Sequence, residues 1–180
     1  MIYRFTIISD ESDDFVREIK IDSDATFLEF HKLILESCGY KDDQMTSFTI
    51  CEHNWEKGVE ITLEEMDTDS DVDSYVMSDT RISDLIEDEK QRLIYTFDPL
   101  ADRCFFIELT EIITGKSLKN GEISLKRGDA PAQTLDFDEL MAKNPTSSTG
   151  LDDEDLYGNE IDDEDISLEG LDISDGNPYE

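Results

Sequence analysis

Acidic residues divide this chain into two regions of different composition. The sequence has 47 Asp and Glu residues against 15 Lys and Arg residues, a formal net charge of −32 at pH 7. Residues 136–180 contain sixteen of the acids and one base, and they lack the aliphatic and aromatic runs of residues 1–135. A segment without such runs cannot bury enough apolar surface to offset the entropy lost on ordering. The sequence therefore predicts a folded domain followed by a disordered acidic tail.

The boundary is predicted at 144–150, where small polar residues with Pro and Gly are typical of a linker. We expect a folded domain over 1–143 and a tail over 144–180. Apolar residues recur every five positions in the tail, within a weak ten-residue repeat that suits neither helix nor strand. Such a segment either folds on a partner as a docking motif or mainly confers solubility. The candidate docking residues are Leu151, Leu156, Tyr157, Ile161, Ile166 and Leu171.

The charge also limits the classes of partner. Nucleic acids and anionic membranes attract Lys and Arg, so a chain this acidic is expected to bind neither directly. An unknown protein with a basic surface is the expected partner. The three cysteines are widely spaced, which favours reduced thiols over disulfides or a zinc site. No leader or spanning segment is recognised, and we expect a cytoplasmic protein without a cofactor.

One helix is strongly indicated near the N-terminus. Thr26 followed by Glu29 forms the sequence pattern of a capping box. Apolar residues then recur at helical spacing from Phe27, and Gly39 is placed to end the helix. The sequence predicts an amphipathic helix between these points.

Strands are predicted around this helix. An opening β-hairpin is expected from the segments 2–8 and 15–21, which are rich in β-branched and aromatic residues. The further expected strands are 45–52, 58–63, 92–97, 104–113 and 123–126, with short helices at 80–88 and 136–142. The order predicts an α+β fold, with a mixed or antiparallel sheet and the main helix packed on one face.

Few residues indicate a particular chemistry. His31 borders the apolar face of the predicted helix, where a hydrogen-bonded core histidine is more common than a ligand or base. His53 follows a strand and could face water, but no spacing supports a metal shared with His31. The acidic segment 67–78 resembles the start of a calcium loop, yet Val72 and Ser78 replace the required Gly and Glu, so an EF-hand is excluded.

The segment 95–109 carries a family resemblance. It reads Tyr-Thr-Phe-Asp-Pro-Leu-Ala-Asp-Arg-Cys-Phe-Phe-Ile-Glu-Leu and resembles the tyrosine–aspartate–aspartate strand pair of the Ri-plasmid ORF-three-like family. Phe30-His31, Gly39-Tyr40 and the segment 128–133 are similar to other motifs of that family, and the acidic tail resembles a Bacteroidetes branch. The resemblance implies a compact α+β fold. The family-motif positions, near which we expect any pocket to lie, are His31, Tyr95, Asp98, Asp102 and Arg103.

Members of that family also carry an insertion-element, TnpR-like label, which would imply a serine recombinase. Such an enzyme needs a serine nucleophile among several arginines and a basic DNA-binding region. Ser9 has no arginine beside it, and the chain ends in an acidic region. We therefore reject this activity.

Three hypotheses about function remain. The first is a non-catalytic protein-interaction module, with the tail as docking segment. The second is a small enzyme or ligand-binding domain that uses a pocket near His31, Asp98, Asp102 and Arg103, and enzymatic activity is left open on these grounds. The third is an acidic decoy that occupies the basic groove of a nucleic-acid-binding protein.

Overall fold

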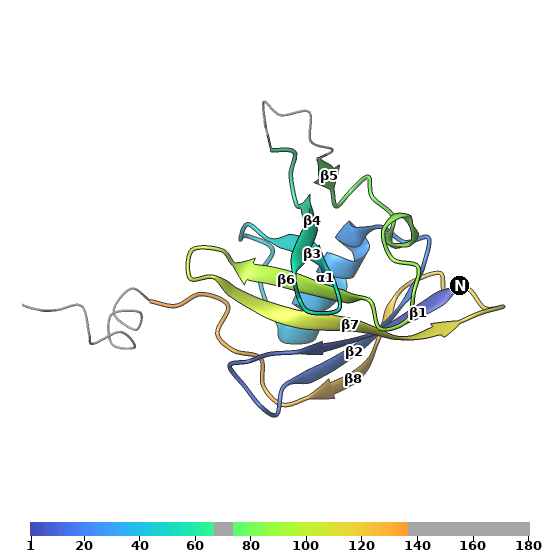
Figure 1. The fold of residues 1–180 in the computed structure, drawn as a ribbon. Helices are drawn as coiled ribbons and strands as arrows, with labels where there is room; N and C mark the ends of the chain where they lie inside the picture. The colour runs from blue at the N-terminus through green and yellow to red at the C-terminus, as the bar shows by residue number, and fades with distance from the viewer. Residues whose placement is uncertain (67–73, 137–180) are drawn as a thin grey trace, which may run out of the picture. The chain divides into compact units, whose positions relative to one another are not determined.

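The computed structural model describes residues 1–66 and 74–136 (Figure 1). Residues Met1–Leu135 form one unit of the chain. In chain order the elements are β1 (Ile2–Ile8), β2 (Val16–Asp22), α1 (Phe27–Cys38), β3 (Ser47–Cys51), β4 (Lys57–Thr62), β5 (Tyr75–Val76), the 3-10 helix η1 (Ile82–Asp84), β6 (Arg92–Asp98), β7 (Arg103–Ile113) and β8 (Glu122–Arg127).

The strands form one eight-stranded sheet in the order β5-β4-β3-β6-β7-β1-β2-β8. All pairings are antiparallel except that of β4 with the short β5. The opening hairpin pairs Ile2 with Asp22 and Ile8 with Val16. Its two strands lie between β7 and β8, so the first segments of the chain pair with some of the last.

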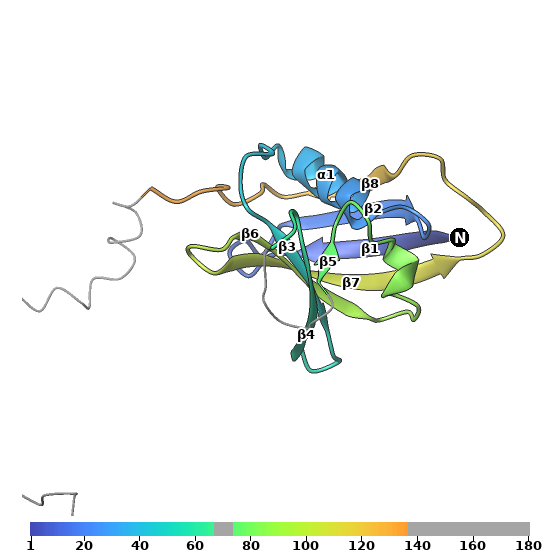
Figure 2. The same ribbon diagram turned by 90° about the horizontal axis from the view of Figure 1, so that it is seen from above.

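The α1 helix begins and ends where the sequence predicts. The Thr26 side chain accepts a hydrogen bond from the Glu29 amide, and the Glu29 carboxylate accepts one from the Thr26 amide. These bonds satisfy amide groups that have no partner within the helix. The helix ends at Cys38, and Gly39 follows with φ 69°. Seen from above, α1 lies across one face of the sheet (Figure 2).

The core between α1 and the sheet is rich in aromatic rings. Phe30 stacks on Phe5 with ring centroids 4.6 Å apart, and on Phe48 at 5.3 Å. Phe27 contacts Phe48 at 5.2 Å. Along β7 from Arg103 to Leu109 every second residue is buried, and β6 alternates in the same way except that Ile94 is buried as well, as expected for strands with one face on a core. The α+β class, the opening hairpin and the single-face packing of the helix are therefore confirmed.

Several local predictions need correction. The short helix expected over 80–88 is a 3-10 turn of three residues, Ile82–Asp84. The acidic segment before it contains β5, which was not predicted, because a strand of two residues has too few side chains to display a period. The remaining strand bounds agree with the predicted ones to within two residues.

Some predictions concern residues that the structure does not describe. These are the tail over 144–180 with its docking residues, the linker boundary at 143, the short helix over 136–142 and most of the calcium-like loop. Within residues 1–66 and 74–136, no helix combines the length and the apolar character that crossing a bilayer requires.

Candidate functional site: an acidic groove beside the β3–β4 turn

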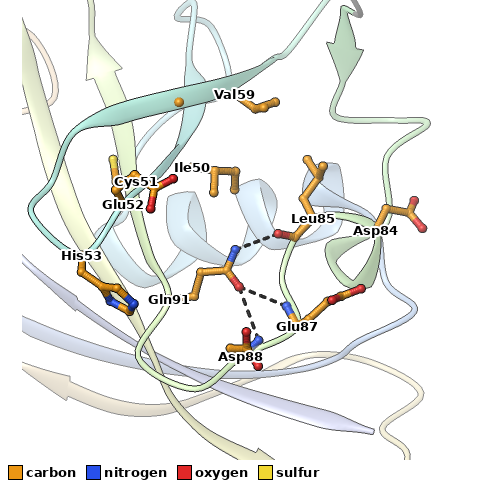
Figure 3. Close-up of a pocket in the computed structure, with 11 residues that line it drawn as sticks. Ile50, Cys51, Glu52, His53, Val59, Asp84, Leu85, Glu87, Asp88 and Gln91 are labelled. Carbon is orange, nitrogen blue, oxygen red and sulfur yellow. Dashed lines mark hydrogen bonds between the residues drawn. The ribbon is translucent and has the colours of Figure 1, made fainter.

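A cavity of about 570 Å³ opens between the β3–β4 hairpin and the chain that leads from η1 into β6. Its walls come from segments far apart in sequence, the hairpin on one side and Asp84–Gln91 on the other (Figure 3). We call this cavity the acidic groove. Its lining residues are Ile50, Cys51, Glu52, His53, Gly58, Val59, Asp84, Leu85, Glu87, Asp88 and Gln91.

The groove has an apolar floor built around a fixed glutamine. Ile50 and Leu85 are partly buried and pack against the hydrophobic core. Gln91 lies beside them, and its side-chain amide donates to the Leu85 carbonyl at 2.8 Å (Figure 3). The Gln91 side-chain oxygen accepts from the amide of Glu87 at 3.0 Å. These bonds hold the segment after η1 in one shape, so the floor is preformed.

The rim of the groove carries negative charge. Glu52, Asp84, Glu87 and Asp88 are exposed carboxylates, and the lining residues include no Lys or Arg. Four carboxylates around one opening create a negative potential that attracts cations.

The Arg92 guanidinium supports the turn that forms one wall. It donates to the His53 carbonyl, lies over the Trp55 ring at 4.9 Å and pairs with Glu108 at 3.4 Å. Trp55 has φ 67° and packs edge-on against Phe106 with centroids 5.1 Å apart. Arg92 thus fastens the β3–β4 turn to the sheet.

The one thiol in the groove is poorly suited to nucleophilic chemistry. Cys51 is 7% exposed, and its sulfur contacts the Thr49 carbonyl at 3.6 Å. Burial raises the pKa of the Cys51 thiol, which lowers its thiolate fraction. Cys104, on β7, also has a raised pKa, about 11, chiefly because of burial. The groove is therefore better suited to binding than to covalent catalysis through Cys51.

Of the positions marked by the family resemblance, His31 and Tyr95 form a buried pair. His31 Nδ1 lies 2.8 Å from the Tyr95 hydroxyl, and Nε2 lies 3.1 Å from a carboxylate oxygen of Asp42. Both ring nitrogens of this fully buried histidine therefore have partners, as expected for a structural core histidine. Burial also raises the pKa of the Tyr95 hydroxyl.

Asp98 and Arg103 form a second cluster around one guanidinium. Arg103 makes two bonds to Glu11, at 2.7 and 2.9 Å, and lies 3.4 Å from Asp98. It also donates to the carbonyl of Ala132 at 2.7 Å. The Tyr40 hydroxyl donates to the neighbouring Pro131 carbonyl at 2.6 Å. These motif residues therefore fasten the closing segment that follows β8.

Asp102 lies apart from both clusters. It is exposed in the β6–β7 turn with φ 51°, and it lines a smaller cavity of about 290 Å³ together with Lys57 and Thr96. Neither this cavity nor the acidic groove is lined by His31, Tyr95, Asp98 or Arg103. The structure thus divides the five motif positions among a buried pair, an ion cluster and an exposed turn.

Sequence reasoning did not predict the acidic groove. Its carboxylates are unremarkable in a chain with 47 acids, and its two walls are at least 25 residues apart along the chain, from Val59 to Asp84. The only local signals were Glu52-His53 after a strand and Glu87-Asp88 before another. Within the described part of the chain, no group of three or more His, Cys, Asp or Glu residues is arranged to hold a metal ion.

Over the residues that the structure describes, the fold and the groove define an α+β domain with one α-helix on an eight-stranded sheet and an acidic recess beside the β3–β4 turn. The chain belongs to the plasmid pRiA4b ORF-3-like protein family, whose model matches residues 2–136. This confirms the predicted family, while its Bacteroidetes branch stays a prediction.

A solved structure, of a protein of unknown function from Methanosarcina mazei Go1, has a similar fold. The two sequences are 15% identical. The match covers 69% of this chain and 68% of the other protein, and the TM-score is 0.53. At this identity the likeness extends to the fold alone. No curated protein matches the chain.

Proposed function

We propose that this protein is a non-catalytic interaction module that binds a basic segment of a partner protein in the acidic groove. The observation that carries the proposal is the combination of exposed carboxylates, Glu52, Glu87 and Asp88 among them, with an apolar floor at Ile50 and Leu85. Lys and Arg side chains have the matching construction, an aliphatic stem that ends in a charged head.

The groove can accommodate both the aliphatic stem and the charged head of such a side chain. The stem would bury apolar surface against Ile50 and Leu85, and each buried methylene contributes about 0.8 kcal/mol. The head would reach the carboxylates on the rim. Because Gln91 already fixes the segment that carries Glu87 and Asp88, little ordering entropy would be lost on binding.

The charge of the whole chain supports the same class of partner. A net charge of −32 attracts basic proteins over a distance set by ionic strength and increases their rate of encounter. Such steering is general, however, so specificity must come from the groove. A test therefore compares a variant that removes charge from the groove with a control variant that removes the same charge elsewhere.

The test measures binding of a fluorescent arginine- and lysine-rich peptide to the full chain by anisotropy. The variant Glu87→Gln/Asp88→Asn removes two rim charges, and we expect binding to weaken about tenfold. The matched control removes two exposed carboxylates elsewhere, Glu36→Gln on α1 and Asp13→Asn in the β1–β2 turn, and should weaken binding less than about twofold. Equal losses in both variants would mean that only overall charge matters, and would refute the groove.

The tail is a second proposed contact, through Leu151, Leu156, Tyr157, Ile161, Ile166 and Leu171. Affinity capture with the full chain and with a chain ending near Asn144 separates the two contacts. If removal of the tail abolishes capture while Glu87→Gln/Asp88→Asn has no effect, the tail is the docking segment and the groove proposal is wrong. If the shortened chain captures the same proteins, the tail is not required.

The acidic-decoy hypothesis predicts a different result. A decoy must compete with DNA for a basic DNA-binding protein, and this competition must be lost at high salt. Competition that Glu87→Gln/Asp88→Asn leaves intact would favour a decoy that acts through the wider acidic surface, and would count against the groove.

A further inference from the structure

The segment 116–127 is basic in an otherwise acidic chain. It contains Lys116, Lys119, Lys126 and Arg127, four of the fifteen bases, and the single acid Glu122. All four cationic residues are exposed. Within the described part of the chain, none of the four forms an ion pair, whereas Glu122 pairs with Lys20 at 3.6 Å. These cations therefore keep their charge available at the surface.

This basic segment lies along the edge of the sheet. β8 (Glu122–Arg127) is the last strand in the sheet order and pairs with β2. Its other edge pairs with no strand of the described residues, so backbone groups of a six-residue strand face outward. Lys116 and Lys119 precede the strand, while Lys126 and Arg127 end it, so the edge has positive charge at both ends.

We propose that β8 is a docking edge for an acidic segment of another protein, which binds in extended conformation as an additional strand. Backbone groups would supply affinity, as in other cases of strand addition. The cations at the two ends of β8 would select acidic sequences. Lysine on an edge strand disfavours indiscriminate pairing, and the same charge favours a partner strand that carries carboxylates.

The acidity of the rest of the chain does not prevent this binding. At physiological ionic strength the Debye length is about 8 Å, so charges beyond the nearest neighbours are largely screened. A ligand on β8 therefore experiences mainly nearby charges, in which the four cations and Lys20 outnumber the neighbouring acids Asp14, Glu18, Glu122 and Asp129. Nucleic acids share the negative charge but present no strand backbone to pair with β8, and we expect them to bind more weakly. This site differs from the acidic groove in position and in the charge of its ligand.

The experiment measures binding of a fluorescent peptide that alternates valine and glutamate to the full chain at physiological salt. The variant Lys126→Glu/Arg127→Glu should weaken binding at least about tenfold. The matched control is Lys90→Glu/Lys57→Glu, which makes the same change of charge at exposed positions separated from β8 by β7, β1 and β2. This control should change the affinity less than about twofold. Slower amide exchange in β8 upon binding would locate the peptide on the edge.

Two further probes separate backbone pairing from attraction between charges. The same peptide with alternate backbone nitrogens methylated keeps its charge but loses strand pairing, and it should bind at least about tenfold more weakly. A single-stranded oligonucleotide of equal charge should bind more weakly still. If either probe binds as tightly as the parent peptide, or if the parent peptide does not bind, the proposal is wrong. Self-association that Lys126→Glu/Arg127→Glu abolishes would assign the edge to a second copy instead, and would also overturn it.

Discussion

Arg103 and Glu11 form a two-bond ion pair between β7 and the β1–β2 turn. Arg103 Nε donates to one carboxylate oxygen at 2.7 Å, and Nη2 donates to the other at 2.9 Å. The guanidinium also lies 4.9 Å from the centre of the Phe97 ring and donates to the Ala132 carbonyl. One side chain therefore joins the opening hairpin, the β6–β7 strand pair and the closing segment.

The first prediction concerns this ion pair. The Arg103 side chain is 7% exposed, so Arg103→Ala leaves Glu11 and Asp98 without their cation and should lower the free energy of unfolding by about 3 kcal/mol. Arg103→Lys keeps the charge but loses the planar guanidinium that makes two bonds to Glu11. It should lower the free energy of unfolding by about 1–2 kcal/mol. Urea denaturation measures both values. The control is Lys20→Ala, whose pair with Glu122 is partly exposed, and the substitution should lower the free energy of unfolding by less than about 1 kcal/mol.

The second prediction compares two glycines that share a left-handed conformation. Gly128 has φ 68°, and a Cβ there would lie 2.3 Å from the Asp14 carbonyl oxygen. Gly115 has φ 72° and nothing within 4 Å of the same position. Gly115→Ala should therefore cost only the backbone strain, about 1–2 kcal/mol. Gly128→Ala should cost a further 1–3 kcal/mol, roughly, because backbone must move. Equal losses in urea denaturation would contradict the close approach of Gly128 to the β1–β2 turn.

The third prediction concerns stability in alkali. Burial raises the pKa of Tyr3, Tyr40 and Tyr95 above the ordinary value of 10.0. Above about pH 10 the unfolded chain loses these protons while the folded chain keeps them, so the free energy of unfolding falls as pH rises. Below that pH the contribution is fully present.

Ultraviolet titration of tyrosinate measures this effect. Of the six tyrosines, the buried ones should ionise only as the protein unfolds. Tyr95→Phe removes one late-ionising group, so its stability should fall less steeply above about pH 10 than that of the parent chain. A common titration of all tyrosines near pH 10 in the folded protein would contradict the burial of Tyr40 and Tyr95.

Local sequence was sufficient wherever structure depends on neighbouring residues. The capping box of Thr26 and Glu29 and the stop at Gly39 set the bounds of α1, because the bonds involved join residues a few positions apart. Segments rich in β-branched and aromatic residues predicted most strands, because this preference also acts within a few neighbouring residues. The two-residue β5 was missed because it depends on a distant partner, with Tyr75 pairing to Ile61 of β4.

The candidate sites depended on distant contacts, and the sequence was a poor guide to them. It grouped His31 with Asp98, Asp102 and Arg103, but Tyr95 and Asp42 occupy both nitrogens of His31. The acidic groove joins a hairpin after β3 to the segment after η1, and no periodicity relates the two. The free edge of β8 likewise follows from the sheet order, which depends on which strands pair.

The acidic character of the chain was fixed by its sequence, as were the change of composition near residue 136 and the family to which residues 2–136 belong. Tertiary structure decided which charged residues lie close together on the surface. Four acidic residues line one cavity, and four cations lie along and beside one edge strand. The physical reason is that net charge is a sum over residues, whereas binding depends on the distances between charges, which the pairing of distant strands sets.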